Sequence, residues 1–167
     1  MIERSHYLKQ LKRATRRSPV TALLGPRQIG NTTLARAFAE GSTSEDQITI
    51  FDLESPPDQR RLQNPEMVLG SLSGLVVIDE VQVMPHLFNI LRVLVDRSQN
   101  QAHFLILGSA SPDIVKDVSE TLAGRVEFID LNGFDLDEVG PANWKKHWIR
   151  GGFPRSFLAE SDDDSMA

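Results

Sequence analysis

The sequence contains no cysteine among its 167 residues, which excludes a disulfide framework and any metal site built on thiolate ligands. It also lacks an apolar run of about 18 residues, so no segment has the length of a membrane-spanning helix. The first residues lack the apolar core of a signal peptide as well. We therefore expect a cytoplasmic chain with no membrane partner, and its length suits a single domain with its own core.

Positive charge is in short supply, since the formal net charge is −5, and this balance argues against a general nucleic-acid binder. The positive charges that are present gather in residues 4–17, which have the pattern of an amphipathic helix. They belong to Arg4, Lys9, Lys12, Arg13, Arg16 and Arg17. A solvated helix face is the simpler interpretation of this segment, and contact with a nucleic-acid backbone is the alternative.

A lysine is missing at one position where a familiar pattern requires it. Residues 25–33 have the spacing of a phosphate-binding P-loop, G-x-x-x-x-G-K-[ST], but the lysine position holds Asn31. The apolar segment 20–24 before the loop is typical of a buried parallel strand, and the Ala-rich segment 31–40 favours a helix. Strand, glycine loop and helix form the context that the motif needs. We expect nucleotide binding by Gly25, Pro26, Arg27, Gln28, Ile29, Gly30, Asn31, Thr32 and Thr33.

The backbone donors of such a loop do not depend on the lysine. Glycines let successive N–H groups point at an anion, and the helix that follows adds about half a positive charge at its first turn. Thr32 stands where a hydroxyl would bind Mg²⁺. The neutral Asn31 amide loses the charge-assisted contact to the phosphates, a cost of ~1.5–3 kcal/mol in binding. Arg27 is the best-placed cation to substitute for the lysine, and a solvated role is the alternative for it.

A second motif follows the clearest strand in the sequence, the apolar segment 75–78. It ends in Asp79 and Glu80, the pattern of a Walker B element. In that arrangement Asp79 would hold the shell of Mg²⁺, and Glu80 would orient and deprotonate the attacking water. The alternative is that the two carboxylates merely end a strand. We favour the Walker B interpretation because the apolar strand and the carboxylate pair occur together, downstream of a P-loop.

Two further residues are candidates for catalytic roles. Ser109 follows the apolar segment 103–107, at a strand end from which a polar side chain can sense the γ-phosphate, and a simple turn hydroxyl is the alternative. Arg125 precedes the strand expected over 126–131. An arginine there could be a finger that reaches the nucleotide of a neighbouring subunit, and a surface ion pair is the alternative.

The alternation of apolar strands with helical segments predicts an α/β fold. Strands are expected over 20–24, 48–51, 75–78, 103–107 and 126–131, and helices over 3–17, 31–40, 65–72 and 113–122. A further helix carries apolar residues at i, i+3, i+4, i+7 and i+8 from Leu87 onward, with Pro85 expected in its first turn.

The character of the sequence changes after Gly140, so we expect a P-loop domain over residues 1–140 and an apolar and acidic extension over 141–167. The extension holds both tryptophans of the chain, Trp144 and Trp148, and further apolar residues up to Leu158. Surface of this kind predicts self-association, or a partner protein, at Trp144–Leu158. The acidic residues of 160–164 complete the extension, which we expect to be the start of a truncated second region.

Together these motifs resemble the amino-terminal ATPase module of a prokaryotic AAA-like family, of the archaeal-ATPase and signal-transduction ATPase type. Residues 22–28, 51–54, 77–82, 107–111, 122–125 and 151–154 carry the resemblance. It implies a P-loop NTPase three-layer sandwich, in which helices flank a five-stranded parallel sheet in the order 5-1-4-3-2. It also implies ATP and Mg²⁺ as ligands. The sequence departs from the family at Asn31, and it ends where the family continues into a C-terminal domain.

Three hypotheses about function follow. The favoured one is an ATP-binding module whose hydrolysis is weakened or absent because the Walker A lysine is missing. The second is a working ATPase in which Arg27, or an arginine of a neighbouring subunit, replaces the lysine. The third is a non-enzymatic scaffold or interaction module that no longer binds nucleotide.

Overall fold

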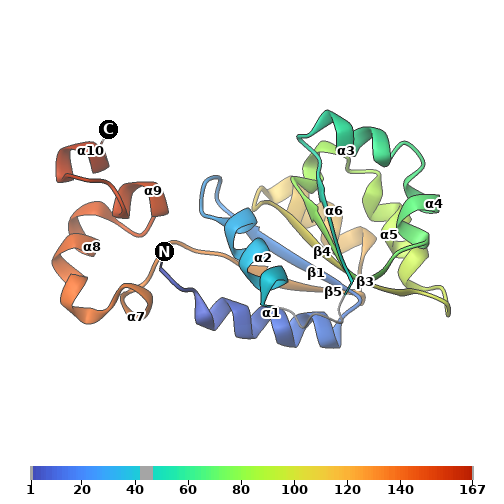
Figure 1. Ribbon diagram of the computed structural model, residues 1–167, viewed down its shortest axis with the longest axis horizontal. Coiled ribbons are helices and arrows are strands. Elements are labelled where there is room, and N and C mark those ends of the chain that lie inside the picture. Colours follow the sequence, from blue (N-terminus) through green and yellow to red (C-terminus); the bar gives the residue numbers. More distant parts are fainter. Residues whose placement is uncertain (1, 42–46, 167) are drawn as a thin grey trace.

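The computed structural model describes residues 2–41 and 47–166, and its centre is a five-stranded parallel sheet in the order β2-β3-β4-β1-β5 (Figure 1). This order is the same as 5-1-4-3-2 and confirms the predicted topology. The strands are β1 (Val20–Gly25), β2 (Ile48–Asp52), β3 (Ser73–Asp79), β4 (Gln101–Ser109) and β5 (Val126–Asp130).

Helices connect the strands and continue beyond the sheet. Those around the sheet are α1 (Ser5–Arg17), α2 (Asn31–Glu40), α3 (Pro56–Arg61), α4 (Pro65–Gly70), the 3₁₀ turn η1 (Val81–Val83), α5 (Leu87–Val95) and α6 (Pro112–Thr121). Those after the sheet are α7 (Leu136–Val139), the 3₁₀ turn η2 (Pro141–Asn143), α8 (Trp144–Arg150), α9 (Pro154–Phe157) and α10 (Asp162–Met166). In this described part of the chain, no helix is long and apolar enough to cross a membrane.

Both faces of the sheet are buried, because helices cover each of them. Every residue of β1 is buried, as a continuous apolar run predicts for a central parallel strand. On one face, α1 and α2 contribute Leu11 and Leu34 to a core that includes Leu105 of β4. On the other face, α5 and α6 contribute Leu91 and Val118 to a second core. The three-layer sandwich expected from the sequence is therefore confirmed.

The parallel arrangement brings the ends of three strands together at one edge of the sheet. Gly25, which ends β1, is the register partner of Ser109, which ends β4. Asp79 ends β3, and β3 is the neighbour of β4 on its other side. The loop between β1 and α2 therefore lies at the edge where ligands bind in open α/β sheets.

Several predicted boundaries are corrected by the structure. The strand expected over 103–107 extends from Gln101 to Ser109, and α1 begins at Ser5 instead of residue 3. Pro85 lies before α5 and not in its first turn, because Leu87 N–H and Phe88 N–H donate to carbonyls three residues back, at Met84 and Pro85. These turns delay the start of the regular helix.

Helices α7–α10 form a small lobe beside the sheet (Figure 1). Its apolar cluster consists of Phe134, Val139 and Phe157, and Ile2 packs against it. The cluster joins residues from both sides of the boundary expected at residue 140. That boundary stays a prediction.

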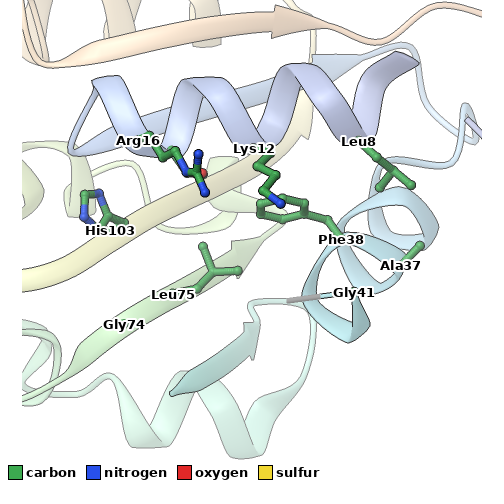
Figure 2. Close-up of a pocket in the computed structure, with 10 residues that line it drawn as sticks. Leu8, Lys12, Arg16, Ala37, Phe38, Gly41, Gly74, Leu75 and His103 are labelled. Carbon is green, nitrogen blue, oxygen red and sulfur yellow. The ribbon is translucent and has the colours of Figure 1, made fainter. Parts of the chain in front are cut away.

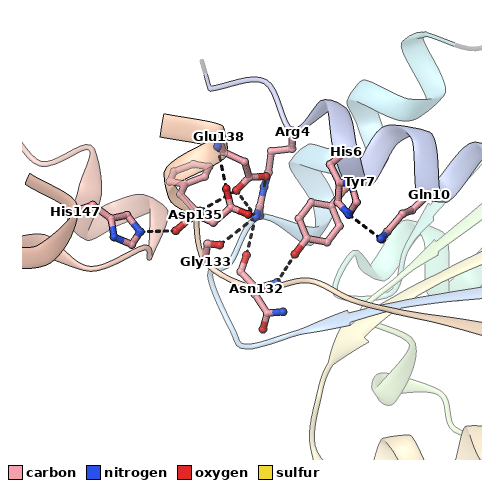
Figure 3. A network of polar contacts seen from close by, with 10 residues as sticks. Arg4, His6, Tyr7, Gln10, Asn132, Gly133, Asp135, Glu138 and His147 are labelled. Carbon is pink, nitrogen blue, oxygen red and sulfur yellow. Dashed lines mark hydrogen bonds and ion pairs between the residues drawn. The ribbon is translucent and has the colours of Figure 1, made fainter. Parts of the chain in front are cut away.

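A buried ion pair connects the amino-terminal segment to this lobe (Figure 3). Arg4 Nε lies 2.8 Å from Glu138 Oε1, and the two side chains are only 8% and 7% exposed. The Arg4 guanidinium also donates to the carbonyl oxygen of Asn132 at 2.8 Å. Arg4 therefore connects the amino-terminal segment to residues 132–138 inside the protein, and it is not part of the exposed basic face of α1.

Candidate functional site

The loop between β1 and α2 has the backbone geometry of an anion cradle. Gly30 stands immediately before α2 with φ of 100°, in the left-handed region that favours glycine. Gly25 allows a close approach, since a Cβ there would lie 2.6 Å from the carbonyl oxygen of Leu131. Gln28 also has positive φ, 64°, a conformation that non-glycine residues adopt mainly at functional sites. These positions turn the chain into α2, whose first N–H groups have no partner within the helix and can bind an anion.

A cavity of about 530 Å³ opens over this loop. All nine loop residues predicted to bind nucleotide line it, Gly25, Pro26, Arg27, Gln28, Ile29, Gly30, Asn31, Thr32 and Thr33. Glu80 and Ser109, predicted from separate motifs, line the same cavity. Glu54 lines it as well, from the segment after β2, and was not among the predicted site residues. The sequence signal that could have found Glu54 is its place just after a parallel strand, the same signal that identified Glu80.

Thr32 lines this cavity and contacts Asp79, which is not among the residues that line it and lies 47 residues away in the sequence. Thr32 Oγ1 donates a hydrogen bond to Asp79 Oδ2 at 2.7 Å, and Asp79 is buried. The other carboxylate oxygen, Oδ1, accepts the backbone N–H of Glu80 at 2.9 Å. Both Asp79 oxygens are thus held in place at the first turn of α2.

A hydroxyl and a carboxylate are the hard oxygen ligands that suit Mg²⁺. Among residues 2–41 and 47–166, no group of three or more His, Cys, Asp or Glu side chains could hold a metal ion. Thr32 and Asp79 therefore fit the kind of magnesium site in which one or two protein ligands act together with phosphate oxygens and water. A cage made only of protein ligands does not fit.

Glu80 has an unusual backbone that directs it into the cavity. Its φ and ψ are 54° and 45°, a left-handed conformation that costs a non-glycine residue of order 1–2 kcal/mol. The Gln82 side-chain amide donates a hydrogen bond to Glu80 Oε2. Gln82 Oε1 is buried and has no hydrogen-bond partner within the described residues. Gln82, which the site prediction did not include, thus orients the Glu80 carboxylate.

Asn31 is anchored to the end of β4. Its Nδ2 donates to the carbonyl oxygen of Gly108 at 3.0 Å. Its Oδ1 is buried without a hydrogen-bond partner in the part of the chain that the structure describes, and it lies 3.1 Å from where a Cβ of Gly25 would be. The side chain is therefore held between Gly25 and the end of β4 and carries no charge.

Arg125 lies away from this cavity, at the start of β5 and so at the opposite edge of the sheet. Its guanidinium donates to both carboxylate oxygens of Asp96 at 2.7 Å. These hydrogen bonds hold the pKa of the Asp96 carboxyl below its usual range. The structure therefore does not bring Arg125 to the P-loop of its own chain, and its action on a neighbouring subunit stays a prediction.

Comparison with known families identifies the family of this chain. Residues 17–140, which include every strand of the sheet and the whole P-loop cavity, match the family model described as AAA domain, AAA_14. The chain belongs to this AAA domain family. The family membership confirms the AAA-like P-loop module that the motifs resembled.

The relatives of this AAA domain include two longer mycobacterial proteins. The uncharacterized proteins Rv2008c of Mycobacterium tuberculosis and Mb2031c of Mycobacterium bovis are each 49% identical to it over all 167 residues. The chain spans 37% of the length of each. The Walker-type ATPase PABY2304 of Pyrococcus abyssi has a similar structure, with a TM-score of 0.66 at 16% identity over 99% of this chain and 70% of that one. At this identity, the likeness shows the fold alone.

Proposed function

We propose that this AAA domain binds ATP or ADP with Mg²⁺ in the P-loop cavity and hydrolyses ATP slowly or not at all. One observation carries the proposal. The loop, Glu80 and Ser109 line one cavity, and Asp79 accepts a hydrogen bond from Thr32 of that loop, whereas Asn31 lines the cavity with a neutral side chain anchored to Gly108. The binding elements are assembled, and the charge that would act on the phosphates is missing.

The other residues take distinct roles in this proposal. Thr32 and Asp79 would hold the magnesium ion, which neutralises phosphate charge when bound. Glu80, already oriented by Gln82, would accept the proton of the attacking water. Ser109 would donate a hydrogen bond to the terminal phosphate from the end of β4. Arg27 is exposed and lines the cavity, so it is the cation of the loop that could approach the phosphates.

Thermal unfolding with and without Mg²⁺-ATP tests nucleotide binding. A ligand that binds only the folded chain stabilises it by about 2.7 kcal/mol at a hundred times its Kd. A domain of this size then unfolds at a temperature several degrees higher, on the order of 2–4 °C per kcal/mol. We expect a shift for the natural chain and a larger one for Asn31→Lys, and both shifts should shrink when EDTA removes the metal.

The other outcomes of this experiment would contradict the proposal in different ways. A shift in the Asn31→Lys variant alone would mean that the natural chain has the P-loop fold but does not bind the nucleotide. No shift in either chain would mean that the cavity is not a nucleotide site at all. Either result would favour the second candidate function, an interaction module.

One specific observation favours that second candidate. The lobe exposes large apolar side chains that a monomer would normally bury, and Trp148 is 86% exposed. The others on the same lobe are Trp144, Ile149, Phe153 and Leu158, each 47–56% exposed. Contiguous exposed apolar surface usually marks a site of protein interaction.

A further inference from the structure

A second cavity, of about 630 Å³, lies at a different place from the P-loop (Figure 2). Helices α1 and α2 form its walls, and the first residues of β3 with those of β4 form its floor. It is lined by Leu8, Lys12, Thr15, Arg16, Ala37, Phe38, Gly41, Gly74, Leu75 and His103. Since the strands are parallel, their starts lie at the edge of the sheet opposite the P-loop.

The pattern of the strands explains why a cavity opens here. Leu105 and Leu107 of β4 and Val77 of β3 face α1 and α2 and are buried in the core between them. His103 continues the same side of β4 two residues earlier, and its register partner on β3 is Leu75. The apolar layer therefore ends at His103 and Leu75. The imidazole of His103 is exposed, and Leu75 beside it is 8% exposed.

Among the described residues that line this cavity, Lys12 and Arg16 carry positive charge. Lys12 and Arg16 are both exposed and one turn apart on α1, and neither has an ion-pair or hydrogen-bond partner among the described residues. Like charges at this spacing destabilise a helix by about 0.2–0.5 kcal/mol per pair. None of the described residues that line the cavity is acidic. In Figure 2 the two cationic side chains extend from α1 over Phe38, Leu75 and His103.

We propose that this cavity binds a small organic phosphate, a ligand that joins a phosphate group to an apolar body. Lys12 and Arg16 match the two negative charges of a phosphate monoester, and His103 can donate a further hydrogen bond. Leu8, Ala37 and Leu75 offer apolar contact for the body of the ligand. Cavities of this volume, mostly apolar and with a few convergent polar groups, are the usual form of small-molecule sites.

A nucleic-acid backbone fits the same features less well. The two cations stand together over one apolar floor, whereas affinity for a phosphate backbone grows with the number of phosphates that a row of cations neutralises. The net charge of −5 also opposes the approach of a long polyanion. The proposal does not depend on the P-loop, because the two cavities share no lining residue.

The test uses 1-naphthyl phosphate as the probe. Inorganic phosphate and 1-naphthol are the comparison ligands, since each offers one half of the probe, the phosphate group or the apolar body. The imidazole signals of the four histidines are followed by NMR, and a His103→Gln variant assigns the signal of interest. Lys12→Gln/Arg16→Gln removes the two cavity cations. Lys9→Gln/Arg13→Gln is the matched control, since it removes two exposed cations at the same spacing on α1 that do not line the cavity.

We expect 1-naphthyl phosphate to shift the His103 signal saturably and to bind at least tenfold more tightly than either half. The Lys12/Arg16 variant should lose at least tenfold in affinity, and the Lys9/Arg13 variant less than threefold. Equal losses of affinity in both variants would mean that the probe is attracted by the total charge of α1 and not by this cavity, and would overturn the proposal. An unmoved His103 signal, or equal binding of the probe and 1-naphthol, would overturn it as well. Tighter binding of a short DNA duplex than of the probe would replace it with a nucleic-acid contact.

Discussion

At the residue scale, Asn31 differs from a working P-loop in charge and in reach. A lysine at this position would extend toward the phosphates, whereas the Asn31 amide ends at the carbonyl oxygen of Gly108, 3.0 Å away. Its Oδ1 is buried without a hydrogen-bond partner among the described residues, so the side chain brings no positive charge to the loop. Thr32 and Asp79, which would hold the magnesium ion in the proposed function, already lie 2.7 Å apart.

The variant Asn31→Lys should therefore gain ATP hydrolysis. A restored charge-assisted contact is worth ~1.5–3 kcal/mol, which corresponds to a rise in kcat/KM of about tenfold to a hundredfold. A phosphate-release assay measures this rise. Asn31→Met is the matched control, because methionine has nearly the length of lysine and also removes the bond to Gly108, but carries no charge. Its activity should stay at the level of the natural chain.

Adding Glu80→Gln to the lysine variant should abolish the gained activity, since the proton acceptor for water is then lost. A lysine variant as inactive as the natural chain would contradict this account of the defect. Fast turnover by the natural chain that disappears in Arg27→Ala would show instead that Arg27 replaces the lysine.

The residues of the candidate site could be proposed from the sequence because each motif fixes its members by spacing along one strand end or one loop. The spacing of the P-loop and the carboxylates after an apolar strand were enough to place Thr32, Asp79 and Glu80. The hydrogen bonds that orient the side chains of Glu80 and Asn31 could not be predicted from the sequence. The contact of Gln82 with Glu80 depends on a left-handed backbone at Glu80, and that of Asn31 with Gly108 depends on which strand lies beside β1.

At the scale of elements, the helices and strands of the sheet followed from periodicity, while the links between distant segments did not. Central strands are continuous apolar runs, so β1, β3 and β4 are recognisable from the sequence alone. The pair of Arg4 with Glu138 joins segments 134 residues apart, and no local pattern encodes it. The sequence groups Arg4 with the basic residues of segment 4–17, whereas in the structure Arg4 contacts Glu138 of α7.

This pair should hold the lobe of α7–α10 against α1. Breaking a buried ion pair by removing one partner costs about 3–5 kcal/mol, because the other charge stays buried alone. In Arg4→Ala we expect amide hydrogen exchange to accelerate in α7 and α8, together with a loss of stability of roughly this size in urea unfolding.

The control for this prediction is Arg17→Ala, which breaks an exposed pair of the same helix with Glu127. Arg17 is 65% exposed, so its loss should change the free energy of unfolding by no more than about 1 kcal/mol. Equal effects of the two substitutions, or unchanged exchange in α7 and α8 of Arg4→Ala, would mean that the apolar contacts of Phe134 and Phe157 alone hold the lobe.

At the scale of the whole molecule, the P-loop site and the exposed apolar surface lie on different parts of the chain. The site is built by the sheet domain, and the apolar surface Trp144–Leu158 belongs to α8, α9 and the segments that flank them. Among the described residues the buried cluster of the lobe consists of Phe134, Val139 and Phe157, and both tryptophans of the lobe stay exposed. A second copy of the chain offers the same apolar surface and could cover it symmetrically.

We therefore expect this chain to self-associate through the lobe, and Trp148→Ser to shift the equilibrium at least tenfold toward the monomer. Burial of a large aromatic side chain at an interface contributes a few kcal/mol, which is more than a tenfold change requires. Sedimentation velocity over a concentration series measures the equilibrium. Met67→Ser is the matched control, because Met67 is 73% exposed on α4 and lies outside the lobe. A natural chain that stays monomeric at about 100 μM, or equal effects of both substitutions, would mean that a different protein covers Trp148 or that its exposure has no role in assembly.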